Sequence, residues 1–154
     1  MRFDPALLEE FRALLQTTGL QRAHGEFVRM FRWLRAELER QMPDFRFQNA
    51  VSGSAIDYAY FTFSDEALRQ KGLKLAVVFE PGSFRLEVWL CGVNRAAGRR
   101  WAEGHKDCPP PFEWAGDRPA DWLVRLPAQA DLADGDAAAA AVKDAAERLR
   151  ALCD

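Results

Sequence analysis

Residues 73–92 read LKLAVVFEPGSFRLEVWLCG, and the expected architecture follows from them. Two segments rich in β-branched and aromatic residues flank the Pro-Gly pair at 81–82, which is typical of two antiparallel strands joined by a short turn. A register that sets Glu80 opposite Ser83 also brings together the pairs Phe79–Phe84, Val77–Leu86 and Leu75–Val88. Side chains alternate between the two faces of a strand, so these pairs share one apolar face. We therefore expect a core-facing hairpin with a strongly fixed register.

Helices are predicted at both ends of the chain. Asp4-Pro5 is a helix start signal, and apolar residues at helical spacing continue the segment to Thr17. A longer amphipathic helix is expected from about Gln21 to Met42, where Pro43 stops it. The run Asp134-Gly135-Asp136 caps a final alanine-rich helix.

The middle of the chain carries shorter elements. Further strands are predicted at 45–51, 55–63 and 122–126, and short helices at 64–71 and 94–103. The proline-rich run at 105–119 is expected to be an ordered surface loop held by Phe112 and Trp114. Helices at both ends and hairpin connections between strands predict one α+β domain over residues 1–154. Its antiparallel sheet of four or five strands packs against the N-terminal and C-terminal helices.

Composition limits the class of protein. A hydrophobic share of 49% is ordinary for a folded domain, and the net charge of −2 disfavours a nucleic acid or an anionic membrane as partner. The N-terminus lacks the apolar core of a signal peptide, and no apolar stretch approaches the roughly 20 residues of a membrane span. Three widely spaced cysteines do not form a disulfide framework. We expect a cytoplasmic protein.

The candidate functional surface is the second face of the hairpin. Alternation places on it the side chains Lys74, Ala76, Val78, Glu80, Arg85, Glu87, Trp89 and Cys91. The predicted register sets Lys74 opposite Trp89. Tyr58 and Tyr60 join this face if Phe61 and Phe63 enter the core. Two interpretations stay open: a set of structural cross-strand charge and cation–π pairs, or a shallow cleft for a small polar ligand.

A second candidate is the segment NRAAGRRW at 94–101. Asn94 opens a predicted helix that carries Arg95, Arg99 and Arg100 in its early turns, where the helix dipole disfavours positive charge. An anionic ligand, such as a phosphate or a carboxylate, would explain the arrangement. The alternative is that these arginines pair with nearby acids: Glu80, Glu87, Glu103 or Asp107.

Catalytic and cofactor motifs are incomplete. His105 and Cys108 are spaced like metal ligands but lack a second pair, so we expect neither a metal nor another cofactor. Cys91 in a strand is interpreted as a small buried hydrophobe. A metal-dependent hydrolase or nuclease of the PD-(D/E)xK type could draw its acids from Asp57, Glu80 or Glu87. However, Trp89 occupies the position of the required lysine.

The runs DYAYFTF and KLAVVF…FRLEVWLCGVNR resemble a family of small uncharacterised bacterial proteins that is classed as a domain of unknown function. The matching positions are Arg85, Glu87, Trp89, Gly92, Asn94 and Arg95. The resemblance implies no activity. We therefore expect a non-enzymatic domain that binds a small polar or anionic ligand, or a protein partner, on one sheet face. The hydrolase or nuclease remains the alternative.

Overall fold

The computed structural model describes residues 4–53, 59–80, 82–105, 108–116, 118 and 120–154. It is an α+β fold with five helices and six strands in those ranges. The elements in chain order are α1 Pro5–Thr17, α2 Leu20–Gln41, β1 Arg46–Gly53, β2 Ala59–Ser64, α3 Glu66–Gln70, β3 Leu73–Glu80, β4 Arg85–Gly92, α4 Arg95–Gly104, β5 Glu113–Trp114, β6 Val124–Ala128 and α5 Gly135–Ala151.

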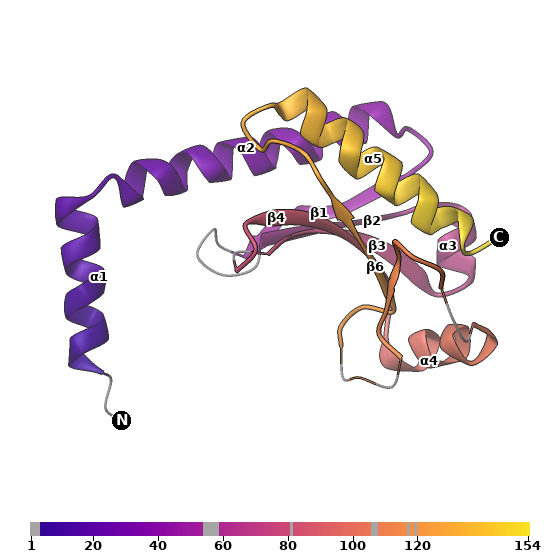
Figure 1. Cartoon of the computed structure of the whole chain (residues 1–154). Coiled ribbons are helices and arrows are strands. Elements are labelled where there is room, and N and C mark those ends of the chain that lie inside the picture. The colour runs from indigo at the N-terminus through magenta and orange to yellow at the C-terminus, as the bar shows by residue number, and fades with distance from the viewer. Residues whose placement is uncertain (1–3, 54–58, 81, 106–107, 117, 119) are drawn as a thin grey trace.

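The six strands form one antiparallel sheet in the order β1-β2-β3-β4-β6-β5, where four or five strands were expected. Helices α2 and α5 lie across one face of this sheet, and α4 lies on the opposite side (Figure 1). The additional strand is β5, which has two residues and pairs Glu113 with Arg125. Its two residues are too few for an alternating pattern to be recognised in the sequence.

The helix ends follow from capping side chains. Asp4, Asp65, Asn94 and Asp134 each accept a hydrogen bond from a backbone N–H in the first turn of α1, α3, α4 and α5. Such caps satisfy donors that have no partner inside the helix. The predicted starts at Asp4-Pro5 and at Asp134 are therefore confirmed.

The core lies between the sheet and helices α2 and α5. The strands contribute the fully buried side chains Phe61, Phe63, Leu75, Val77, Phe79, Leu86, Val88 and Leu90. Helix α2 adds Phe31, Leu34 and Leu38, and α5 adds Ala138, Ala139, Val142, Ala145, Ala146 and Leu149. The small residues of α5 let that helix lie close to the sheet. Phe112 and Trp114 pack against this core and hold the proline-rich loop, as predicted.

The register of the β3–β4 hairpin differs from the prediction by two residues. Glu80 pairs with Arg85 and Phe79 with Leu86, so residues 81–84 connect the strands. The physical reason is a turn built around Glu80, whose carboxylate accepts hydrogen bonds from the Gly82 N–H at 3.1 Å, the Ser83 N–H at 2.6 Å and the Ser83 hydroxyl.

This correction moves two predicted contacts. Phe84 is 68% exposed and has a positive φ of 50°, although its ring still meets that of Phe79 edge-on. Lys74 lies opposite Cys91, not Trp89. A shift by two residues keeps each side chain on its face. The predicted division into a core face and a second face is therefore confirmed apart from Phe84.

The last strand was also predicted with shifted bounds. β6 begins at Val124 and includes Pro127, whereas the expected strand began at Trp122 and ended before the proline. β5 pairs with only two residues of β6, so most of β6 is an edge strand, where proline is tolerated.

Candidate functional site

The second face of the sheet is built around Glu87, whose side chain has 0% exposure. Cross-strand pairing places it in a row between Val78 on β3 and Pro127 on β6. A buried carboxylate is costly unless donors surround it. The stability of the buried Glu87 charge therefore depends on the hydrogen-bond donors that surround it.

Three side chains donate to the Glu87 carboxylate. Arg85 donates from Nε at 2.9 Å and from Nη2 at 2.5 Å to Oε1. Oε2 accepts from the indole Nε1 of Trp89 at 2.7 Å and from Nη1 of Arg125 at 3.3 Å. Both oxygens are thus engaged, and the charge is balanced by two guanidinium groups.

The network continues through Arg125 to the edge of the sheet. Arg125 donates to Glu113 from Nε at 2.9 Å and from Nη2 at 3.0 Å, in a bidentate pair. The guanidinium of Arg125 also lies 4.7 Å from the ring centroid of Trp122, and that of Arg118 lies 5.5 Å from the same ring. The rings of Trp122 and Trp89 are 6.4 Å apart. We call Glu87, Arg85, Trp89, Arg125, Glu113 and Trp122 the Glu87 network.

The sequence indicated only half of this network. Arg85, Glu87 and Trp89 were predicted from alternation along the hairpin. Arg125 could have been found from its place between the inward-facing Val124 and Leu126. Glu113 gave no usable signal, because its position depends on β5. The alternation of Trp122 with Val124 and Leu126 predicted a strand residue, whereas Trp122 precedes β6 and packs against the second face.

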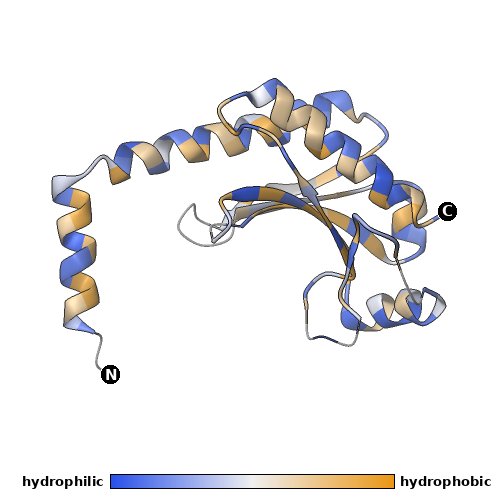
Figure 2. Ribbon diagram, in the orientation of Figure 1, coloured by the Kyte–Doolittle hydropathy of each residue, from blue (hydrophilic) through white to orange (hydrophobic). Residues whose placement is uncertain are grey.

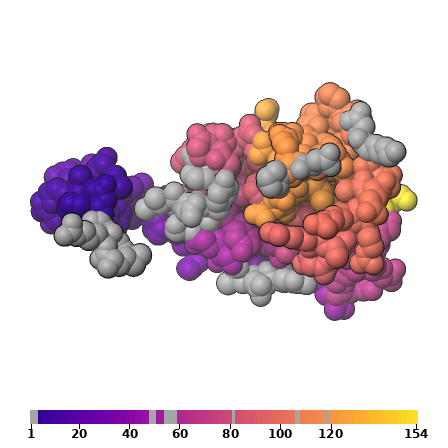
Figure 3. Space-filling model, turned by 90° about the horizontal axis from the view of Figure 1, so that it is seen from below, coloured from indigo at the N-terminus to yellow at the C-terminus, as the bar shows by residue number. Residues whose placement is uncertain are grey.

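Other predicted residues of this face are dispersed. Tyr60 is 43% exposed and lies opposite Val78, and Lys74 is partly exposed and forms no ion pair or hydrogen bond within the described ranges. The Glu80 carboxylate accepts hydrogen bonds from the hairpin turn, at Gly82 and Ser83. Tyr58 lies outside the described residues. In the view from below, the segment around β5 and β6 and helix α4 lie in front of part of the sheet (Figure 3).

The arginines of α4 do not join the Glu87 network. Asn94 caps the helix by accepting from the Ala97 N–H at 2.9 Å. Arg95, Arg99 and Arg100 are exposed, and none forms an ion pair in the part of the chain that the structure describes. Pairing with Glu80 or Glu87 is therefore wrong as an explanation, because those acids are engaged elsewhere, and Asp107 lies outside the described residues.

Arg100 lines a shallow basic depression of about 430 Å³ together with Arg69, Gln70, Lys71, Gly72 and Trp101. Two of its three cations have partners, since Arg69 pairs with Glu66 and the Lys71 ammonium donates to the Cys153 carbonyl. Among the cations that line this depression, only Arg100 forms neither an ion pair nor a side-chain hydrogen bond in the described ranges.

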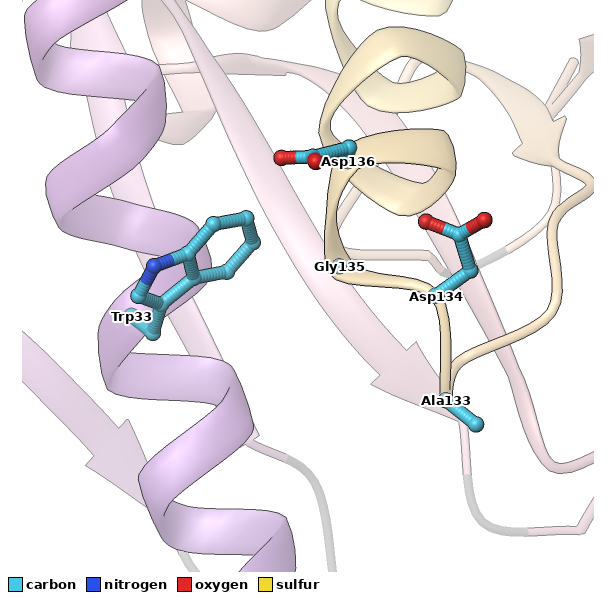
Figure 4. A pocket seen from close by; sticks show the side chains of 5 residues that line it. All are labelled: Trp33, Ala133, Asp134, Gly135 and Asp136. Carbon is cyan, nitrogen blue, oxygen red and sulfur yellow. The ribbon is translucent and has the colours of Figure 1, made fainter.

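A second depression, of about 550 Å³, lies between α2 and the start of α5 (Figure 4). The indole of Trp33 packs against Gly135, where a Cβ atom would lie 2.6 Å from the ring. The Asp136 carboxylate points toward the indole, whereas Asp134 caps α5 by accepting from the Ala137 N–H at 3.0 Å. Trp33 and Gly135 thus fit together as a packing contact between the two helices.

The cysteines are unsuited to nucleophilic chemistry. All three are buried and none forms a disulfide, and burial raises the pKa of the Cys91 thiol to about 12 and that of Cys153 to about 11. His105 stacks on Trp101, and its Nδ1 lies 2.8 Å from the Trp101 carbonyl oxygen. Within the described residues, no group of three potential ligands is arranged to hold a metal ion.

The fold and the site define a small α+β domain with helices on the core face of its antiparallel sheet and a buried charge network on the other. The chain belongs to the family described as Domain of unknown function (DUF7000), which matches residues 5–150. No curated protein and no solved structure matches the chain. Among the described residues, no helix combines the length and the hydropathy of a membrane span.

Proposed function

We propose that this domain is a non-catalytic binding module that takes a small anionic ligand on the second face of its sheet, around Trp89. The observation that carries the proposal is the fully buried Glu87, which holds two guanidinium groups and an indole in fixed positions. Side chains held in this way lose little conformational entropy when a ligand binds.

The groups that remain available favour an anion. Arg85 uses Nε and Nη2 on Glu87, which leaves Nη1 of this half-exposed guanidinium for another acceptor. Lys74 lies diagonally across from Trp89, and its ammonium has no partner in the described part of the chain. The partly exposed indole of Trp122, which already carries the guanidinium groups of Arg118 and Arg125, gives this side of the site an apolar wall.

The geometry gives less support to the hydrolase or nuclease alternative. Both Glu87 oxygens accept hydrogen bonds, so a metal ion would have to displace donors from a buried carboxylate. The Glu80 carboxylate is committed to the turn. Asp57 lies outside the described residues. A carboxylate with this many donors serves better to position cations than to bind another one.

Thermal unfolding tests the proposal with inorganic phosphate, citrate and adenosine monophosphate as probes. At least one should raise the unfolding temperature in a saturable way, because a ligand of the native state stabilises it by mass action. Lys74→Ala should weaken the effect. Lys143→Ala removes the same charge from α5, away from this face, and should not.

Two results would contradict the proposal. One is that no probe raises the unfolding temperature. The other is an equal rise in the wild type, Lys74→Ala and Lys143→Ala proteins, which would show the general stabilisation that excluded anions give to any folded protein.

A further inference from the structure

Helix α1 carries an apolar stripe that the rest of the described chain leaves open. None of its residues is buried, and the side chains of the stripe are 41% to 63% exposed: Leu7, Leu8, Phe11, Leu14 and Leu15. Both the ribbon and the space-filling view show α1 standing away from the sheet and its covering helices (Figures 1 and 3). Colouring by hydropathy shows both apolar and polar residues along this helix (Figure 2).

A helix of this length needs a partner. Isolated helices shorter than about 12–15 residues are marginal in water, and α1 has 13. Exposed contiguous apolar surface marks interaction sites. The family match begins at residue 5, where α1 itself begins, so this helix is part of the domain that defines the family.

The stripe is symmetric about its centre, which fits a second copy of the same chain. Phe11 stands in the middle, with a leucine pair one turn before it and another one turn after it: Leu7 and Leu8, then Leu14 and Leu15. A two-fold interface joins identical patches, so each patch must match itself. Two such stripes place phenylalanine on phenylalanine and leucine on leucine.

Charge decides how the two copies face each other. Successive residues are about 100° apart around a helix, so Glu10 and Arg12 flank Phe11 on opposite sides of the stripe. A two-fold axis along the helices brings the acidic flank of each copy against the basic flank of the other. An axis across the helices would bring like charge against like charge. Glu10 forms no ion pair within the described ranges, whereas Arg12 pairs with Glu9.

We propose that the α1 stripe is the contact between two copies of this chain, with their α1 helices packed parallel and Glu10 of each copy beside Arg12 of the other. This contact shares no residue with the Glu87 network, so a test of the dimer is independent of the test for the proposed ligand.

Light scattering after size-exclusion chromatography, run on the full chain over a range of concentrations, tests the contact. The wild type should be a dimer that dissociates on dilution. Phe11→Glu should raise the dimer dissociation constant by roughly tenfold or more. Because no α1 residue is buried, this variant should keep the wild-type unfolding temperature when both proteins are measured dilute enough to be monomeric, where dimerisation adds no stability. Phe84→Glu makes the same change at an exposed phenylalanine outside α1 and is the matched control for the dimer.

Charge exchange tests the parallel arrangement. Glu10→Arg and Arg12→Glu should each weaken the dimer, and the double variant should restore it, since the two flanks again carry opposite charges. If the dimer of the double variant were no tighter than the dimers of the single variants, the parallel packing would be overturned.

A wild type that is monomeric at every concentration, or a Phe11→Glu dimer of wild-type affinity, would overturn the self-association. Sedimentation of monomeric wild type with anionic lipid vesicles would assign the stripe to a membrane surface instead.

Discussion

The indole Nε1 of Trp89 lies 2.7 Å from Oε2 of Glu87, two residues earlier on the same face of β4. Trp89 thus donates a hydrogen bond to one oxygen of the buried carboxylate, while Arg85 donates to the other. Trp89 occupies the position at which a nuclease of the type considered would need lysine. Here its N–H acts as a donor that stabilises the acid.

Arg85 and Glu87 should be strongly coupled. Arg85→Ala leaves a buried carboxylate with fewer donors and should lower the free energy of unfolding by about 1–3 kcal/mol. Adding Glu87→Leu removes that buried charge. The loss of unfolding free energy in the double variant should therefore be smaller than the sum of the losses in the two single variants. Urea unfolding of all four proteins measures the coupling. Additive losses would show that the network contributes no pairwise stabilisation.

Gly92 should tolerate no side chain. A Cβ atom there would lie 2.6 Å from the Gly98 backbone nitrogen and 2.7 Å from the Asn94 carbonyl oxygen, so the first turn of α4 would have to move. Gly92→Ala should cost about 1–3 kcal/mol in urea unfolding. Gly25→Ala is the control, because nothing lies within 4 Å of its Cβ, and alanine should stabilise α2 by up to about 1 kcal/mol. Equal effects of the two changes would contradict this packing.

The pKa of Glu80 should report the hairpin turn. Hydrogen bonds from the Ser83 hydroxyl and the Ser83 backbone N–H hold the pKa of this carboxyl below its ordinary value. A lowered folded-state pKa means that the turn contributes stability above about pH 4.5, which is lost as pH falls through the folded pKa. Carboxyl NMR titration should show that Ser83→Ala raises the pKa of Glu80. An unchanged pKa in that variant would mean that the Ser83 hydroxyl does not hold the carboxylate.

The thiols should be protected in the native state. With a Cys91 pKa of about 12 and a Cys153 pKa of about 11, almost no thiolate exists at pH 8, and all three cysteines are buried. An aromatic disulfide reagent should therefore label none of them rapidly at pH 8, and should label three per chain in guanidinium chloride. Peptide mass spectrometry assigns the sites. Rapid native labelling of Cys91 would contradict its burial.

Local signals in the sequence were enough to predict the helix starts, the two faces of the hairpin and the α+β class. Asp4-Pro5 and Asp134 act through hydrogen bonds within one turn, and alternation along β3 and β4 is a property of each strand alone. The predicted register was wrong by two residues, but the assignment of side chains to the two faces was still right. A side chain changes face only when the register shifts by an odd number of residues.

Side-chain hydrogen bonds and contacts between distant segments were decided by the three-dimensional structure. The turn at 81–84 took its length from hydrogen bonds to the Glu80 side chain, which a strand pattern does not reveal. Arg125 reaches Glu87 across 38 positions of sequence, and it does so only because β6 pairs with β4. The sequence by itself could place Glu87 on the second face of the sheet. That Glu87 is fully buried between two arginines and an indole could not be predicted from the sequence, because Arg125 comes from another strand that only the folded sheet brings beside β4.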